Sequence, residues 1–169
     1  MMRESFEEEG EMSDRIPQAK SENETVPSTV GLGMIDASAK VARKSVLIIE
    51  DEPGLAEIIA INLQASGYEP TVAHDGLQAL YHLDRTTPDV ILLDLQLPQV
   101  SGFRLIQLLR GRESTATVPV IVMTALSFRE AEDVVRAGAD GFLTKPFAPE
   151  EVVARVDQLV AQRAQSRDG

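Results

Sequence analysis

From residue 44 onward, short apolar runs alternate with segments in which apolar residues recur at helical spacing. The central run, 90–93, is wholly apolar and is followed by Asp94. A run of this kind is typical of a strand that is buried on both faces, as in a parallel sheet covered by helices. Four further strands are predicted, at 45–49, 69–73, 120–123 and 141–144.

A helix is predicted after each strand. Pro53 is well placed to open the first helix, Gly67 suits its C-terminal cap, and Ser101 can cap the third. The fourth helix covers roughly 128–137. The predicted inner faces are apolar residues at helical spacing: Leu55, Ile58, Ile59 and Leu63 in the first helix, Ala79, Leu80 and Leu83 in the second, Leu105, Ile106 and Leu109 in the third, and Val152, Val153, Val156, Leu159 and Val160 in the last.

Strands that alternate with helices of this length predict right-handed crossovers and a parallel sheet. Five such units form one three-layer α/β domain, predicted at 44–165, with a short C-terminal tail at 166–169. Residues 1–43 are rich in acids and poor in large apolar side chains, so they cannot bury enough surface to offset the entropy of ordering. We predict a disordered acidic tail there. Docking of this tail on a partner, and a later translation start at Met34, are left open.

Composition narrows the class of protein. The net charge of the 169-residue chain is −11, which argues against a basic face for nucleic acid or an anionic membrane. The chain has no cysteine, which excludes disulfides, thiol catalysis and cysteine-based zinc sites. No apolar run approaches the roughly 20 residues that span a bilayer. We therefore expect a cytoplasmic protein with neither nucleic acid nor membrane as a partner.

Polar side chains stand at the ends of four predicted strands. Glu50 and Asp51 follow the first, Asp94 the third, Thr124 the fourth and Lys145 the fifth. Each acid alone is more often a cap or a solvated loop residue, but a parallel sheet gathers these strand ends at one edge. Three carboxylates there repel one another unless a cation lies among them, and hard oxygen ligands suit Mg²⁺. With a lysine and a hydroxyl, they are the parts that a phosphoryl-transfer site needs.

The same residues belong to a longer joint pattern. It consists of the acidic pair Glu50-Asp51, Asp94 with its LxLP sequel and Gly102, Thr124-Ala125, the aromatic Phe142, and Lys145-Pro146-Phe147. In this pattern, residues 45 to about 163 resemble the receiver domain of bacterial two-component response regulators. The resemblance implies a flavodoxin-like (βα)5 fold with a parallel five-stranded sheet of order 2-1-3-4-5. Because no output domain follows in this sequence, we expect a stand-alone receiver.

The resemblance also implies a role for each matching residue at the metal site. Asp94 would take a phosphoryl group from a phosphohistidine on a sensor histidine kinase, giving an acyl phosphate. Mg²⁺ would be held by Asp94 and Asp51, by Glu50 largely through water, and by the backbone carbonyl of Gln96. Glu50 stands where aspartate is commoner, a variant that should preserve metal binding.

Further roles follow for the residues that sense the phosphoryl group. Lys145 would hold a phosphoryl oxygen, and its bond to Pro146 is typically cis in this family. Thr124 would swing its hydroxyl onto the phosphoryl group, joined by the amide of Ala125. Phe142 would rotate into the space that Thr124 leaves and alter the surface of the last two helices and the last strand. The chain would be a phosphoacceptor regulator that catalyses only its own phosphorylation and slow dephosphorylation.

Competing interpretations fit the sequence less well. A phosphatase with an aspartate nucleophile needs a second acid where this chain has Gln96. A flavodoxin-like cofactor binder needs a phosphate loop where this chain has three acids, 50–52. A degenerate receiver, acting as a non-phosphorylated interaction module, is kept as the alternative. The expected partners are a sensor histidine kinase or phosphotransfer protein and an unknown downstream protein target, and phosphorylation-dependent dimerisation is left open.

Overall fold

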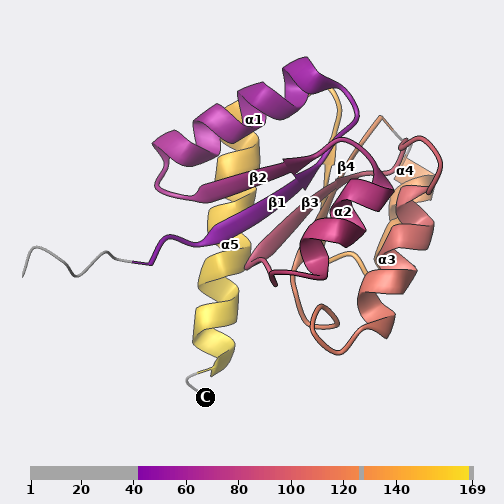
Figure 1. The fold of residues 1–169 in the computed structure, drawn as a ribbon. Helices are drawn as coiled ribbons and strands as arrows, with labels where there is room; N and C mark the ends of the chain where they lie inside the picture. The colour runs from indigo at the N-terminus through magenta and orange to yellow at the C-terminus, as the bar shows by residue number, and fades with distance from the viewer. Residues whose placement is uncertain (1–41, 126–127, 168–169) are drawn as a thin grey trace, which may run out of the picture. The chain divides into compact units, whose positions relative to one another are not determined.

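The computed structural model describes residues 42–125 and 128–167. Within these residues, five strands and five helices alternate from the first to the last (Figure 1). The prediction of a disordered tail at 1–43 falls outside the described residues, except for its last two positions. The strands are β1 Ser45–Ile49, β2 Glu69–Ala73, β3 Val90–Asp94, β4 Val120–Thr124 and β5 Gly141–Thr144. The helices are α1 Pro53–Ala65, α2 Gly76–Leu83, α3 Gly102–Gly111, α4 Phe128–Arg136 and α5 Pro149–Arg167.

The strands form one parallel sheet in the order β2-β1-β3-β4-β5, as predicted. The register aligns Ile48 of β1 with Leu92 of β3, and Leu92 with Ile121 of β4. β3 and β4 each extend one residue further than predicted, so Asp94 and Thr124 are the last residues of their strands. All five carboxyl ends therefore lie along one edge of the sheet, and all five amino ends lie along the opposite edge.

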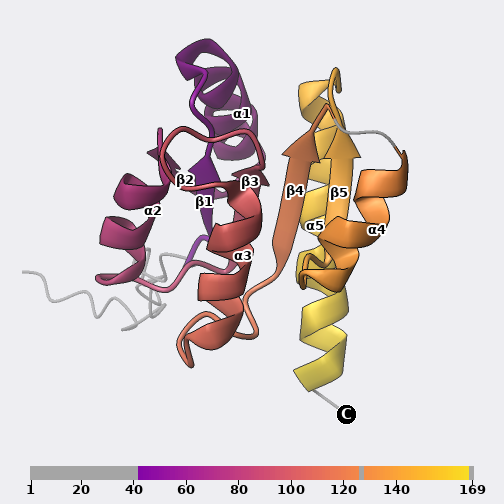
Figure 2. The same ribbon diagram turned by 90° about the vertical axis from the view of Figure 1, so that its right-hand side faces the viewer.

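Helices cover both faces of the sheet, which confirms the three-layer α/β fold (Figure 2). On β3, Ile91 and Leu93 pack with the buried residues of α2, α3 and α4, while Val90 and Leu92 pack with those of α1 and α5. This alternation follows from the two-residue period of a strand. All five residues of β3 are buried, because the strand lies at the centre of the sheet and is covered on both sides.

The termini of the helices show the capping chemistry that their sequences predict. Pro53 occupies the first turn of α1, and Gly67 follows this helix with a φ of 90°. The hydroxyl of Ser101 accepts a hydrogen bond from the backbone N–H of Arg104 at 3.3 Å and so caps α3. None of the helices in the described part of the chain is long and apolar enough to cross a membrane.

The predicted inner face of α1 is partly wrong. Ile59 and Leu63 are buried as expected, but Ile58 is 48% exposed and Ala56 is buried in its place. Positions 56, 59 and 63 lie on one side of a helix. The small side chain of Ala56 allows that side to approach the sheet closely, which turns Ile58 outward.

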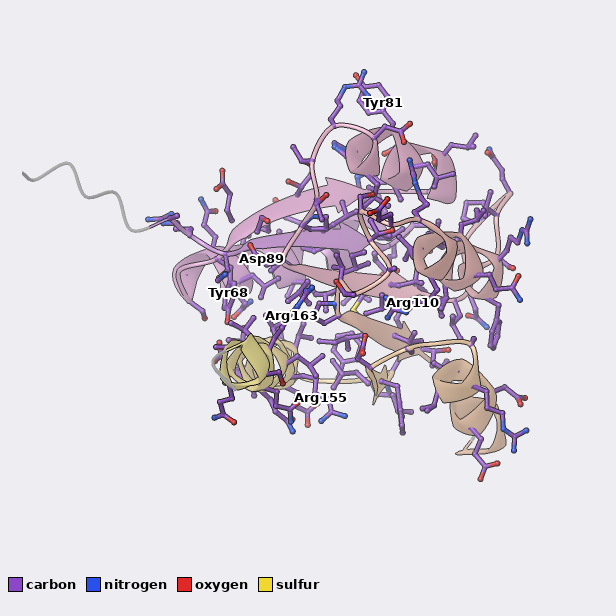
Figure 3. The ribbon with its side chains drawn as sticks, turned by 90° about the horizontal axis from the view of Figure 1, so that it is seen from below. Tyr68, Tyr81, Asp89, Arg110, Arg155 and Arg163 are labelled. Carbon is purple, nitrogen blue, oxygen red and sulfur yellow. The ribbon has the colours of Figure 1, made fainter. Side chains whose placement is uncertain are left out.

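Several polar side chains form hydrogen bonds between loops near the amino edge of the sheet (Figure 3). Asp89, just before β3, accepts hydrogen bonds from the backbone N–H of Ser45 at 2.9 Å and from the ammonium of Lys44 at 3.0 Å. Arg110, near the end of α3, donates to the backbone carbonyls of Val118 and Gly138, both at 2.8 Å. These contacts connect loops that are distant in sequence, and none of them involves the strand ends at the carboxyl edge.

Candidate functional site

The carboxyl edge of the sheet brings the predicted reactive residues together. Glu50 and Asp51 follow β1, Asp94 is the last residue of β3, and Lys145 follows β5. Lys145 is further held in place by its backbone N–H, which donates to the backbone carbonyl of Thr124 at 2.8 Å. The peptide bond between Lys145 and Pro146 is cis. Residues more than 90 positions apart in the chain thus share one site.

The ammonium of Lys145 joins two buried carboxylates. Its Nζ donates to Oδ2 of Asp94 at 2.6 Å and to Oε2 of Glu50 at 2.9 Å. Burial alone would lower the pKa of Lys145, but the hydrogen bonds and charges of Asp94 and Glu50 outweigh burial and raise it. Burial raises the pKa of the Glu50 carboxyl; the hydrogen bond from Lys145 opposes this rise, and the charge of Asp94 adds to it.

The carboxylate of Asp94 is fixed from both sides. Its Oδ1 accepts a hydrogen bond from the backbone N–H of Gln96 at 2.8 Å, and its Oδ2 is held by Lys145. The loop behind it is clamped, because the N–H of Gly102 donates to the carbonyl of Leu95 at 3.1 Å. A Cβ at Gly102 would stand 2.5 Å from Cα of Leu95, so only glycine fits there. The side chain of Asp94 is 5% exposed, which leaves it a small opening to a reactant.

The donor set at this edge fits a hard divalent cation. Glu50, Asp51 and Asp94 each offer one carboxylate oxygen, and these three atoms lie within 4.8 Å of one another. Three carboxylates and the ammonium of Lys145 leave an excess of two negative charges, which Mg²⁺ would neutralise. Asp51 is exposed to solvent, so a cation that keeps several waters can reach it. Gln96, whose backbone carbonyl is predicted as a further ligand, lies in the loop that follows Asp94.

The remaining predicted residues lie beside this cluster. Thr124 is 3% exposed at the end of β4, and Ala125 is exposed immediately after it. Phe142 is half-buried on β5, opposite Val122, and packs against the core cluster to which Val134 of α4 contributes. Phe142 therefore packs on the face of the sheet to which α4 contributes a buried residue, and its predicted switch role stays a prediction.

Two features of the site were not predicted from the sequence. The first is the contact of Lys145 with Glu50. The sequence indicates it only through the residue type, because the side chain of glutamate is one methylene longer than that of aspartate. The second is the support that His74 gives to the loop after β1. Its Nδ1 lies 3.1 Å from the backbone carbonyl oxygen of Glu50, so the imidazole supports the loop that carries the acidic pair.

Comparison with known proteins decides the family. Residues 46–157 match the family described as response regulator receiver domain. The chain belongs to this family. The receiver is 42% identical over 118 residues to the DNA-binding dual master transcriptional regulator RpaA of Synechocystis, covering 68% of this chain and 48% of RpaA. It is 40% identical over 120 residues to the phosphate regulon transcriptional regulatory protein PhoB of Escherichia coli, covering 69% of this chain and 52% of PhoB.

A solved structure supports the interpretation of the acidic edge. The receiver domain of the sensor histidine kinase PA1611 from Pseudomonas aeruginosa has a magnesium ion coordinated in its active-site cleft. It matches this receiver with a TM-score of 0.65 and 30% identity over 71% of this chain and 99% of that one. Receiver domains bind Mg²⁺ at their acidic site, and the cluster of carboxylates in this chain is consistent with such a site. This receiver thus belongs to a family of signalling regulators of two-component systems.

The expectation of partners requires a correction. The receiver spans about half the length of RpaA and PhoB, and RpaA is a DNA-binding regulator. The prediction that nucleic acid is not a partner is therefore wrong. It relied on the net charge of −11, which is an average over this sequence. Such an average does not describe the other segments or proteins through which a signal can reach DNA. The prediction of a stand-alone receiver without an output domain stays a prediction.

Proposed function

We propose that this receiver is a phosphoacceptor in which Asp94 takes a phosphoryl group from a phosphohistidine of a sensor histidine kinase or a phosphotransfer protein. The observation that supports this most strongly is the position of Lys145, whose ammonium lies 2.6 Å from Asp94 Oδ2 at an edge that also holds Glu50 and Asp51. A nucleophile, a fixed cation and a set of metal ligands therefore occupy one small volume. The alternative of a non-phosphorylated module is not favoured, because every reactive group is present.

The transfer requires little movement of Asp94. One carboxylate oxygen of Asp94 attacks phosphorus, so that a P–O bond forms and the P–N bond of the phosphohistidine breaks. The electron pair of that bond returns to the ring nitrogen, which leaves as neutral imidazole when the other ring nitrogen carries a proton. The N–H of Gln96 and the ammonium of Lys145 orient the carboxylate before the reaction, which lowers the entropy lost in the transition state.

Charge stabilisation comes from both sides of the transferred group. Mg²⁺, held by Asp51, Asp94 and the carbonyl of Gln96, would neutralise charge on the phosphoryl oxygens. Lys145 would exchange its contact with Asp94 for a phosphoryl oxygen. The hydroxyl of Thr124 and the N–H of Ala125, at the end of β4, would donate to another.

The readout of phosphorylation follows from the packing around β4 and β5. When the hydroxyl of Thr124 turns toward the phosphoryl group, the ring of Phe142 would move toward the space beside β4. Because Phe142 packs in the cluster that contains Val134, this movement would change how α4 packs against the sheet. The altered surface of α4, β5 and α5 would then select the downstream partner or a second copy of the receiver.

We also propose that DNA is among the final targets of the signalling pathway. The support for this is similarity to RpaA, a DNA-binding regulator, over 48% of its length. Capture of DNA by the phosphorylated receiver with its cellular partners, compared with the unphosphorylated receiver, tests the proposal. Equal recovery of DNA in both states would count against a phosphorylation-controlled route to DNA.

The proposed chemistry is tested by intact mass spectrometry after incubation with acetyl phosphate, with and without Mg²⁺. We expect a Mg²⁺-dependent gain of one phosphoryl group in the wild type and none in Asp94→Asn. A matched control is Asp89→Asn, since Asp89 lies at the opposite end of β3 and contacts Lys44 and Ser45 instead of the site. If no gain occurs with acetyl phosphate or with a phosphorylated histidine kinase, the phosphoacceptor function is refuted.

A further inference from the structure

A cavity of about 500 Å³ lies at the amino edge of the sheet, at the opposite end of the strands from the reactive residues. Its wall is formed by three segments that are distant in sequence: the turn before β3, the loop before β4 and the C-terminal part of α5. Sites for small molecules in proteins have volumes of about 300–1,000 Å³. The cavity is therefore large enough for an organic molecule as well as for an ion.

Two cationic side chains line this cavity from different elements. Lys44 precedes β1, and Arg163 belongs to α5. The ammonium of Lys44 donates to Oδ1 of Asp89 at 3.0 Å, and Nη2 of Arg163 donates to Oγ1 of Thr117 at 2.9 Å (Figure 3). Within the described part of the chain, these two side chains make no other hydrogen bond. Each cation is thus held in position and keeps further N–H donors for a ligand.

Asp89 is the one carboxylate among the described residues that line the cavity, and both of its oxygens are engaged. Oδ1 accepts from Lys44, and Oδ2 accepts from the backbone N–H of Ser45 at 2.9 Å and from its hydroxyl at 3.2 Å. The wall carries two positive charges and one negative charge, which gives a net charge of +1 in a chain whose net charge is −11. A ligand that binds here should therefore be an anion.

The rest of the wall indicates which anion fits. Its polar part is completed by three hydroxyl groups, those of Thr87, Ser114 and Thr117. Because Oγ1 of Thr117 accepts from Arg163, its own O–H can donate to a ligand. A phosphate group has three strong acceptor oxygens, which suit a guanidinium, an ammonium and hydroxyls together. Val160 and Ala164, one turn apart on α5, provide an apolar surface beside these donors.

We propose that this cavity binds a small organic phosphate. Arg163, Lys44 and the hydroxyl of Thr117 hold the phosphate group, and the organic part lies against the apolar surface of α5. A bound molecule would connect α5 to the segments that lead into β3 and β4, whose far ends carry Asp94 and Thr124. The inference is independent of the phosphoacceptor function, because the cavity shares no residue with the carboxyl edge.

Three compounds test the proposal: adenosine monophosphate, inorganic phosphate and adenosine. Each is titrated into the full chain without Mg²⁺, up to about 10 mM, while backbone ¹H–¹⁵N NMR signals are recorded. The signals of Thr87, Thr117 and Val118 report on the cavity, and those of Gln96 and Ala125 report on the carboxyl edge.

We expect adenosine monophosphate to shift the cavity signals saturably and to leave the signals of the carboxyl edge unchanged. Inorganic phosphate should shift the same signals with a dissociation constant at least about tenfold higher, because it lacks the organic part. Adenosine should give no saturable shift. The inference is overturned if adenosine monophosphate shifts only the carboxyl edge or nothing, if adenosine binds equally well, or if inorganic phosphate binds as tightly as the monophosphate.

Variants of α5 test whether the cations of the cavity are responsible. Arg163→Gln removes one positive charge, and Ala164→Glu places a negative charge on the wall. Each should weaken binding of adenosine monophosphate by about tenfold or more. The matched control is Arg104→Gln, which removes one positive charge from α3, where Arg104 contacts Gln107 at 3.2 Å outside the cavity. The control should change the affinity by less than about twofold. Equal weakening by the control would indicate a general charge effect and would overturn the inference.

Thermal unfolding provides an independent measurement. A ligand that binds only the folded protein raises the midpoint of unfolding with its concentration. The wild-type midpoint should therefore rise with adenosine monophosphate, whereas that of Ala164→Glu should not. This variant should fold, because Ala164 is exposed and glutamate favours helices. A wild-type midpoint that does not respond to adenosine monophosphate would overturn the inference, whether or not Asp94 accepts a phosphoryl group.

Discussion

Replacing Arg110 with methionine should destabilise the receiver substantially, because this one side chain fastens three segments. Its guanidinium connects the end of α3 to the loop before β4 and to the turn before β5 (Figure 3). The contacts are Nε to Gly138 O at 2.8 Å, Nη1 to Val118 O at 2.8 Å, to Ala116 O at 3.1 Å and to Thr115 O at 3.4 Å, and Nη2 to Asp140 Oδ2 at 2.8 Å.

The magnitude follows from how well each contact is shielded from water. The side chain of Arg110 is 22% exposed, so the three shorter contacts with carbonyl groups are largely protected and contribute about 1 kcal/mol each. The ion pair with Asp140 adds only about 0.5 kcal/mol, because the carboxylate is 45% exposed. Methionine keeps most of the apolar contact of the side chain. The free energy of unfolding should therefore fall by about 3.5 kcal/mol.

The measurement is urea unfolding followed by far-ultraviolet circular dichroism, since the chain has no tryptophan. The matched control is Arg104→Met on the same helix, because the guanidinium of Arg104 makes an exposed contact with Gln107 at 3.2 Å. The control should change the free energy of unfolding by less than about 0.5 kcal/mol. If Arg110→Met differs from the control by no more than that amount, the contacts of Arg110 do not stabilise the fold.

Two further predictions concern Asp89, which precedes β3, and Gly102, which lies against the loop that follows β3. Burial alone would raise the pKa of Asp89, but hydrogen bonds from Ser45 and Lys44 outweigh burial and hold the pKa below its usual value of 3.8. A lowered pKa stabilises the fold above that value, so Asp89→Asn should lower stability at neutral pH, and its difference from the wild type should shrink below about pH 4. Gly102→Ala should destabilise by about 1–3 kcal/mol, since its Cβ would stand 2.5 Å from Leu95 Cα.

Both predictions have internal checks. For Asp89→Asn, urea midpoints are measured across acidic pH, and a difference from the wild type that stays constant down to strong acid would contradict the ion-pair explanation. For Gly102→Ala, the comparison is Gly54→Ala in α1, where a Cβ would meet nothing within 4 Å. That change should stabilise by roughly 0.5–1 kcal/mol, because alanine restricts the unfolded helix segment more than glycine does. A neutral Gly102→Ala would show that the loop after Asp94 relaxes easily.

The elements of this fold are readily predicted from sequence because strands that are buried on both faces leave an unmistakable signal. The run that precedes Asp94 has no polar residue, and its flanking helices carry apolar residues at clear spacing. The face of α1 was harder to predict, since Ile58 looks like a core residue beside Ile59, whereas Leu55 does pack against the core as predicted. Ala56 carries too little apolar surface to indicate that it lies against the sheet, and packing alone decides the rotation of the helix.

For the candidate site, the sequence alone predicts which residues come together. A parallel sheet gathers its carboxyl ends, so Asp94, Thr124 and Lys145 had to converge. The partners within the site were not predictable, because they depend on side-chain conformations. The contact of Lys145 with Glu50 arises from the length of glutamate and from a backbone held by His74, which lies 24 residues away. The sequence says still less about partners outside the chain, as the wrong prediction that nucleic acid is not a partner shows.

The separation of the two edges of the sheet has a consequence for protein engineering. The reactive groups occupy the carboxyl edge, whereas the turn at 85–88 lies at the amino edge, where Thr86 and Thr87 are exposed. Lengthening such a turn adds only about 0.6 kcal/mol of closure entropy for each doubling. A fluorescent reporter inserted at this turn would therefore leave Asp94 and its neighbours undisturbed, so the receiver could be followed by fluorescence without altering its reactive site.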